Sequence, residues 1–167
     1  MGTIIRRVTI YAHEKAGVIR CCNGMTTVYI FEIDGMKIAG YLSHIGSALA
    51  GSDLIDVNWI TGANKFIMFG SAGSLDSNVT NGKFVIPTAT YRETKAKLEA
   101  RKNEGCLAVE MELAGVQAVC DFYGWELFDF LVTGDVLDQA VYDVSGLANA
   151  NHNMDKLYIA IEIAKRI

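Results

Sequence analysis

The order of the predicted elements indicates an α/β protein, with a three-layer α/β/α arrangement around a mixed central sheet. Three observations lead to this fold class: a strand and a hairpin come first, helices and strands then alternate, and the connections between them are short. A chain of 167 residues fits one domain better than two. We therefore expect a single domain over residues 1–167.

The N-terminal part of the chain carries the strongest strand signals. Thr3–Tyr11 is β-branched and apolar and predicts a strand. Thr26–Ile33 and Met36–Leu42 predict two more strands, and Asp34-Gly35 stands between them. An Asp-Gly pair between two such runs favours a tight hairpin turn, in which both residues take positive φ.

A helix and two short strands follow. Ser47–Ile60 is predicted to be a helix that ends at Thr61-Gly62. Lys65–Phe69 reads as a short buried strand that leads into a glycine-rich turn. Lys83–Ile86 predicts another strand, which stops at Pro87, the only proline in the chain.

The second half of the chain predicts three helices and one strand. Glu93–Glu104 is a very polar segment, typical of a solvated helix. Glu110–Tyr123 predicts a helix that is apolar on most of its circumference, and Leu127–Thr133 predicts a strand. Asn153–Ile167 has apolar residues spaced for one face of a closing amphipathic helix.

Charge and hydropathy exclude several classes of partner. The net charge is −4, which argues against nucleic-acid binding by bulk electrostatics. No run approaches the roughly 18 apolar residues of a membrane span, and the N-terminus lacks the features of a signal peptide. We therefore expect a cytoplasmic protein without nucleic-acid or membrane partners.

The four cysteines form a poor disulfide framework, which suits a reducing compartment. A metal site built from His13, Cys21 and Cys22 is conceivable, but no Cys-x-x-Cys spacing supports it. Burial of small apolar thiols explains the cysteines better, and we expect no metal site.

The stretch Gly70-Ser71-Ala72-Gly73 follows the predicted strand at Lys65–Phe69. Glycines at a strand end let backbone N–H groups approach a ligand, and the Ser71 hydroxyl can bond a phosphate or a sugar. The same pattern is also typical of a tight turn without a ligand. Taken alone, this stretch leaves both interpretations open.

Two carboxylates flank a methionine in Glu110-Met111-Glu112, at the start of a predicted helix. One carboxylate near a helix N-terminus is explained by capping, because it accepts hydrogen bonds from free N–H groups. Two carboxylates beside buried residues are harder to explain structurally. A ribose diol is a suitable partner for a group that only accepts hydrogen bonds.

Asp135 follows the predicted strand at Leu127–Thr133. In an open α/β sheet, ligands bind at the carboxyl ends of the strands, so this position suits a catalytic carboxylate. An aspartate there is also a common helix cap or turn former. Asp135 by itself therefore does not decide between the two roles.

In combination, these segments resemble the nucleoside phosphorylases and nucleosidases of the purine nucleoside phosphorylase and uridine phosphorylase superfamily. The resemblance runs from about Val28 to the C-terminus. Its motifs are His44-Ile45-Gly46-Ser47-Ala48, Phe69-Gly70-Ser71-Ala72-Gly73-Ser74-Leu75, Val85-Ile86-Pro87-Thr88-Ala89 and Gly105-Cys106-Leu107-Ala108-Val109-Glu110-Met111-Glu112.

The resemblance implies roles for individual residues. Glu110, Met111 and Glu112 would bind the substrate, with Glu112 on the sugar hydroxyls and Met111 packed on the sugar face. Asp135 would be catalytic and assist protonation of the leaving base. Ser71, Gly73 and Arg92 would be the phosphate-binding residues. No cofactor is implied beyond inorganic phosphate as co-substrate, and the chain is a possible homo-oligomer.

Two departures from the family pattern stand out. The segment Tyr11–Gly17 does not match the family's glycine- and arginine-containing phosphate loop. Ala89 passes almost directly into Thr90, where the family has a longer stretch, so the chain resembles a shortened member with an internal deletion.

Three functions remain open from the sequence. The first is phosphorolysis, in which a nucleoside and phosphate give a base and a pentose 1-phosphate. The second is a hydrolytic nucleosidase, with Glu14 as the only acid near the N-terminal loop. The third is a catalytically silent scaffold of the same fold, trimmed or engineered. The preference between uracil and purine bases is also open.

Overall fold

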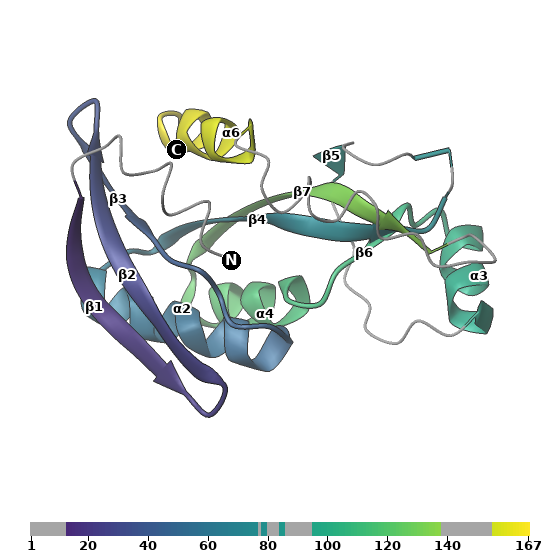
Figure 1. Cartoon of the computed structure of the whole chain (residues 1–167), viewed down its shortest axis with the longest axis horizontal. Helices are drawn as coiled ribbons and strands as arrows, with labels where there is room; N and C mark the ends of the chain where they lie inside the picture. Colours follow the sequence, from purple (N-terminus) through teal and green to yellow (C-terminus); the bar gives the residue numbers. More distant parts are fainter. Residues whose placement is uncertain (1–12, 77, 80–83, 86–94, 138–154) are drawn as a thin grey trace. The chain divides into compact units, whose positions relative to one another are not determined.

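The computed structural model describes residues 13–76, 78–79, 84–85, 95–137 and 155–167 (Figure 1). Two compact units are distinguished. The first consists of Met1–Phe66 with Gly115–Leu127, and the second of Ile67–Ala114 with Phe128–Ile167. The single domain expected for the whole chain stays a prediction. The expected strand at Thr3–Tyr11 lies outside the described residues.

The first unit contains a three-stranded antiparallel sheet in the order β1-β2-β3. Its strands are β1 (His13–Cys21), β2 (Gly24–Ile33) and β3 (Met36–Gly40). The hairpin between β2 and β3 is confirmed: Asp34 and Gly35 have φ of 52° and 79°, which the tight turn requires.

Strand β1 is not expected from the sequence. Residues 13–17 belong to the segment that does not match the family's phosphate loop, but they pair with β2 across a register shift between Lys15 and Gly17. The shift has the form of a β-bulge, which interrupts the alternation of apolar and polar residues that would have revealed the strand. Downstream of the shift, Ile19 is buried, so the strand is anchored in the core.

Two helices of the first unit come into close contact through small residues. Helix α2 (Ser47–Thr61) ends at Gly62 in the left-handed conformation, as expected, and α4 spans Leu113–Tyr123. A Cβ atom on Gly115 of α4 would overlap the backbone carbonyl of Ser47. A Cβ atom on Gly51 of α2 would lie 3.1 Å from the carbonyl oxygen of Gly115. Glycine at 115 is therefore a condition of this helix packing.

A buried histidine–aspartate pair ties the connection between β3 and α2 back onto the helix. The N–H of His44 donates to Oδ2 of Asp53 at 2.8 Å, and Nδ1 of His44 lies 2.9 Å from Oδ1. Asp53 is 2% exposed. The N-cap of α2 is Gly46, which offers no side-chain cap. The hydrogen bonds that Asp53 accepts from His44 therefore hold the segment before the helix in place.

The second sheet has four strands in the order β5-β7-β4-β6. They are β4 (Lys65–Ser74), β5 (Phe84–Val85), β6 (Ala108–Val109) and β7 (Glu126–Val136). β6 is antiparallel to β4, and β5 is antiparallel to β7. The long arrows of β4 and β7 point the same way in Figure 1, so the sheet is mixed, as expected.

Two strands of this sheet are longer than the sequence suggests. β4 continues to Ser74, so the glycine-rich stretch lies in a strand and not in a turn. β7 continues to Val136, so Asp135 also lies within a strand. Both extensions are held by neighbouring strands: Gly73 and Ser74 pair with β6, and the N–H of Leu137 donates to the carbonyl of Ser74.

The core of the second sheet is made where three strands meet. Ala72 of β4, Ala108 of β6 and Leu131 of β7 form a cluster of buried apolar side chains. Two alanines leave room for the larger leucine between closely spaced strands. The α/β class is confirmed, although the described strands are divided between two sheets.

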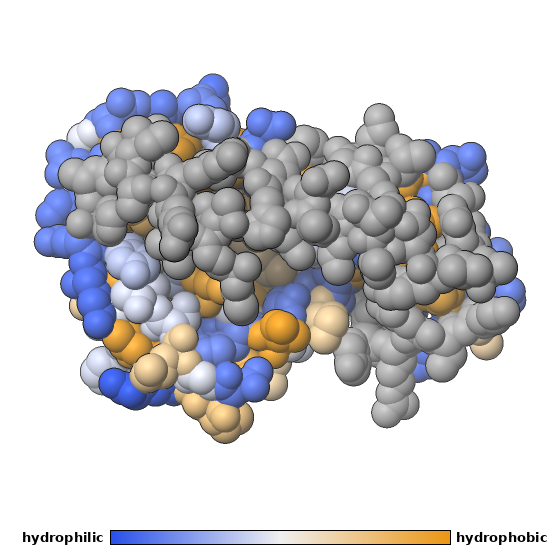
Figure 2. Space-filling model, viewed as in Figure 1, coloured by the Kyte–Doolittle hydropathy of each residue, from blue (hydrophilic) through white to orange (hydrophobic). Residues whose placement is uncertain are grey.

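Two further helices complete the described part of the chain. α3 (Lys95–Asn103) and α6 (Asp155–Ala164) confirm the helices expected near these positions. Among the described residues, no helix is both long enough and apolar enough to cross a membrane. Figure 2 shows orange apolar residues interspersed with blue polar ones on the coloured part of the face that it draws.

Replacing Gly115 by alanine should destabilise the protein, because the added Cβ overlaps the backbone of Ser47. We expect a loss of about 3 kcal/mol in the free energy of unfolding, the upper end of the usual cost of overpacking. Urea denaturation measures it. Gly70→Ala is the control, since its Cβ would make only an ordinary contact of 3.5 Å with Leu131. Equal stability of the two variants would contradict the proposed contact.

Replacing Asp53 by alanine should leave the backbone N–H and ring N–H of His44 without their acceptor. We expect a loss of about 2–3 kcal/mol, because hydrogen bonds to a buried charged group are among the strongest. Asp56→Ala on the same helix serves as the control and should change stability by less than about 0.5 kcal/mol. A loss at Asp53 no larger than at Asp56 would refute the role of the pair.

Candidate active site

Glu110 is a helix cap, positioned just after β6 and just before α4. Its Oε2 accepts hydrogen bonds from the N–H of Glu112 at 2.6 Å and from the N–H of Leu113 at 2.8 Å. The first turn of a helix leaves such N–H groups without partners. The helix therefore begins at Leu113, not at Glu110 as expected, because the Glu110 side chain occupies the capping position.

The second oxygen of Glu110 is in a different situation. The residue is only 5% exposed, and Oε1 has no hydrogen-bond partner within the described part of the chain. Burial is the largest cause of a raised pKa for this carboxyl group. The two backbone hydrogen bonds oppose the rise, and the charges of Glu112 and Asp129 add to it. Glu110 is therefore a buried carboxyl group with one fixed and one available oxygen.

Met111 and Glu112 lie in the connection between β6 and α4. The Met111 side chain is 37% exposed and is accessible to a ligand. Glu112 is half-buried and already interacts with a neighbouring group. Their positions suit a sugar site, and the roles assigned to them from the family resemblance stay predictions.

Gly73 brings two of the predicted site segments together. It pairs with Val109, the residue before Glu110. A Cβ atom built on Gly73 would lie 3.3 Å from Oδ1 of Asp135 and 2.8 Å from a methyl carbon of Leu137. A side chain at this position would therefore have to displace the ends of the Leu137 and Asp135 side chains. One glycine thus has the Glu110 segment on one side and Asp135 on the other.

Ser71 is directed to the same face of β4 as the space above Gly73, because side chains alternate along a strand. It is half-buried and interacts with a neighbour. Asp135 is 8% exposed and also has an interaction partner. Six predicted site residues therefore belong to one unit: Ser71, Gly73, Glu110, Met111, Glu112 and Asp135. Arg92, the predicted phosphate contact, lies outside the described residues, as do Ala89 and Thr90 at the expected deletion.

Asp129 is an acidic residue that belongs to none of the sequence motifs. It lies in β7, on the same side of the strand as Asp135 by alternation. Burial raises its pKa, and Oδ2 has no hydrogen-bond partner among the described residues. The signal in the sequence is a single carboxylate within the apolar run from Leu127 to Val132.

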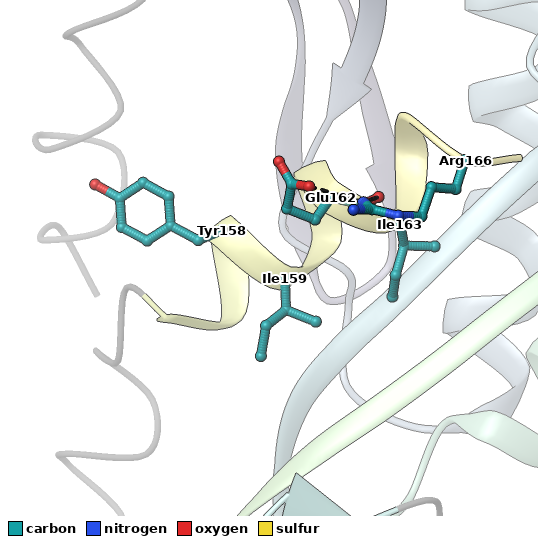
Figure 3. A pocket seen from close by; sticks show the side chains of 5 residues that line it. All are labelled: Tyr158, Ile159, Glu162, Ile163 and Arg166. Atoms are coloured by element: carbon teal, nitrogen blue, oxygen red, sulfur yellow. Dashed lines mark hydrogen bonds and ion pairs between the residues drawn. The ribbon is translucent and has the colours of Figure 1, made fainter.

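A shallow groove along α6 is lined by apolar and charged side chains (Figure 3): Tyr158, Ile159, Glu162, Ile163 and Arg166. Glu162 and Arg166 form an ion pair across one turn of the helix, at 2.7 Å. None of these residues is a predicted site residue. Within the described ranges, no group of three or more His, Cys, Asp or Glu side chains is placed to hold a metal ion.

The raised pKa of Glu110 predicts a pH-dependent contribution to stability. A carboxyl group whose pKa is raised by folding stabilises the fold below its ordinary pKa, and this contribution is lost as the pH rises through the folded-state value. Relative to the parent, Glu110→Gln should therefore gain stability as the pH rises above the ordinary glutamate pKa of about 4.3. Urea denaturation below and above that pH measures the difference, with exposed Glu104→Gln as the control. A difference that does not vary with pH would contradict the burial of this charge.

Comparisons with known proteins give matches in structure only. No family model and no curated protein matches the chain. A mutant of futalosine hydrolase from Helicobacter pylori matches with a TM-score of 0.74 and 14% identity, over 98% of this chain and 93% of that one. The 5′-methylthioadenosine/S-adenosyl homocysteine nucleosidase of the same organism matches with a TM-score of 0.73 and 14% identity, over 96% and 93%.

Both of these proteins are members of the nucleoside phosphorylase and nucleosidase superfamily. The matched region spans the site segments at the end of β4, after β6 and at the end of β7. At this level of identity the likeness concerns the fold, and the chain has the fold of that superfamily.

Proposed function

We propose that the protein is a hydrolytic nucleosidase, which uses water to cleave the bond between a base and a pentose. The observation that carries the proposal is that Gly73 has the buried Glu110 segment paired on one side and the buried Asp135 on the other, on a fold like that of two hydrolytic enzymes. Those enzymes are named a hydrolase and a nucleosidase. Hydrolysis therefore replaces phosphorolysis as the preferred interpretation.

Carboxyl groups suit the transition state of this reaction. As the bond from the sugar to the base breaks, positive charge develops on the sugar ring, as in glycoside hydrolysis. Anionic groups placed beforehand near the ring stabilise that charge more than they stabilise the neutral substrate. Glu112 would hold the sugar hydroxyls, and Met111 would pack against the sugar.

Asp135 would assist the departure of the base. A buried carboxyl group that carries a proton can donate it to a ring nitrogen of the leaving base. The close approach at Gly73 fixes the position of Asp135 relative to β4. In the overall reaction, a nucleoside and water give a free base and a free pentose.

An acidic site also favours water over phosphate as the nucleophile. Phosphate carries negative charge, so its approach to ionised Glu110 and Glu112 is opposed by like charges unless a cation compensates. Arg92 is the predicted cation. Phosphorolysis, with Ser71, Gly73 and Arg92 around the phosphate, is the second candidate, and the family resemblance supports it.

The experiment is base release by the purified protein from uridine, inosine, adenosine and 5′-methylthioadenosine, with and without phosphate. The last substrate is chosen because a similar nucleosidase binds it. We expect release at the same rate in both conditions. Release that requires phosphate would support phosphorolysis, and no release from any substrate would support a silent scaffold.

Glu112→Ala should remove the acceptor for the sugar hydroxyls. We expect base release to fall by about 100-fold or more, which is typical when a group that stabilises the transition state is lost. Steady-state kinetics on the best substrate measures the effect. Glu104→Ala, at an exposed residue just after α3, is the matched control. Full activity in the Glu112 variant would remove this residue from the sugar site.

A further inference from the structure

The connection between β6 and α4 is three residues long, and both of its ends are fixed. Before it, β6 pairs with the end of β4, and after it, α4 begins at Leu113. The residues between these points are Glu110, Met111 and Glu112. Whatever holds the backbone of this short segment therefore decides the directions in which its side chains leave it.

The side chain of Glu110 holds this backbone. Its Oε2 accepts the N–H of Glu112 at 2.6 Å and the N–H of Leu113 at 2.8 Å, so it reaches past Met111 and closes a ring with the main chain. Hydrogen bonds to an ionised acceptor are shorter and stronger than those between neutral groups. The bond to Glu112 acts one residue before the helix, so it restrains the connection as well as the helix.

Exposure divides the three residues of the connection in the same way. Glu110 is 5% exposed, whereas Met111 is 37% exposed and Glu112 is half-buried. The two residues that are more accessible to a ligand are therefore held by a third that is buried. A buried acceptor whose hydrogen bonds stay within the segment supports its neighbours without itself having to reach a ligand.

We propose that Glu110 is a positioning residue, whose Oε2 sets the backbone of Met111 and Glu112 so that both side chains meet the sugar. This inference rests on the proposed function, in which Met111 and Glu112 bind the pentose. It gives the two hydrogen bonds of Oε2 an effect on catalysis, beyond their effect on the stability of α4. That effect acts through Glu112, whose carboxylate has to reach the sugar hydroxyls.

Small displacements of Glu112 are expected to slow the reaction. Groups that bind a substrate or stabilise a transition state have to be held within a fraction of an ångström of their productive positions. Without an acceptor at residue 110, the N–H of Glu112 loses its restraint, and the main chain of the connection can rotate about its φ and ψ angles. The Glu112 carboxylate would then spend less of its time directed at the sugar.

Glu110→Ala and Glu110→Gln form a matched pair of variants, because both remove the negative charge of the side chain. Only Glu110→Gln keeps an oxygen that can accept the two N–H groups. We expect kcat/KM for base release to be lower in Glu110→Ala than in Glu110→Gln by about tenfold or more. Equal values in the two variants would overturn the positioning role, because the hydrogen bonds of Oε2 would then have no effect on the reaction.

Combining each of these substitutions with Glu112→Ala tests whether the effect passes through Glu112. Once that carboxylate is absent its position no longer matters, so the two double variants should have the same kcat/KM. Such non-additivity is expected of residues that act as a unit. A radiolabelled nucleoside extends the assay to the low rates of these variants. A difference that persists at full size in the double variants would refute the assignment, because Glu110 would then act by another route.

Amide hydrogen exchange followed by NMR gives a readout that does not depend on activity. The N–H groups of Glu112 and Leu113 should be protected in the parent and in Glu110→Gln, and should exchange faster in Glu110→Ala. The N–H of Leu137, which donates to the carbonyl of Ser74, is the internal control for a general loss of stability. Exchange at Glu112 that rises no more than exchange at Leu137 would contradict the proposed restraint.

The failure of this inference and the failure of the proposed function have different signatures. A parent protein that releases no base would overturn the proposed function, and the effect of Glu110 on catalysis with it. The exchange measurement would still show in that case whether Glu110 holds the segment. An active parent with equal kcat/KM in Glu110→Ala and Glu110→Gln would overturn this inference alone.

Discussion

The absence of a side chain at Gly73 is the constraint on which the candidate site depends. Gly73 pairs with Val109 on one side, and a side chain on it would press into Leu137 and Asp135 on the other. Because no Cβ is present, the side chains of Asp135 and Leu137 can lie over the end of β4. The segments that follow or end the neighbouring strands carry Glu110, Met111, Glu112 and Asp135, so Gly73 leaves space on the face of the sheet beside these residues.

Burial gives these acidic groups their chemical character. Glu110 uses one oxygen to cap α4, and this structural bond holds the other oxygen in a fixed and buried position. Capping and chemistry are therefore not competing explanations for this residue, because each uses a different oxygen. The same burial raises the pKa of Asp129. A site with this electrostatic character favours a neutral nucleophile and a cationic transition state, which is the basis for preferring hydrolysis over attack by phosphate.

Local signals in the sequence predict much of the fold. The Asp34-Gly35 turn and the end of α2 at Gly62 follow from backbone preferences that act over a few residues. The glycine-rich end of β4 and the start of α4 could not be predicted in the same way. The sequence Gly70–Gly73 is typical of a turn, but its last residue pairs with β6 and the stretch lies in a strand. Glu110 is expected within the helix, but its side chain caps the helix from outside. The sequence does not single out Asp129, because this carboxylate stands alone within an apolar run, and it does not reveal β1, because a bulge interrupts the pattern of that strand.

The identity of the sugar product tests the central claim most directly. The purified protein would be incubated with its best nucleoside substrate in saturating phosphate, and the sugar product would be identified by mass spectrometry. We predict a free pentose even when phosphate is abundant, because water is the nucleophile in the proposed reaction. A pentose 1-phosphate would contradict it and would return Ser71, Gly73 and Arg92 to the role of a phosphate site.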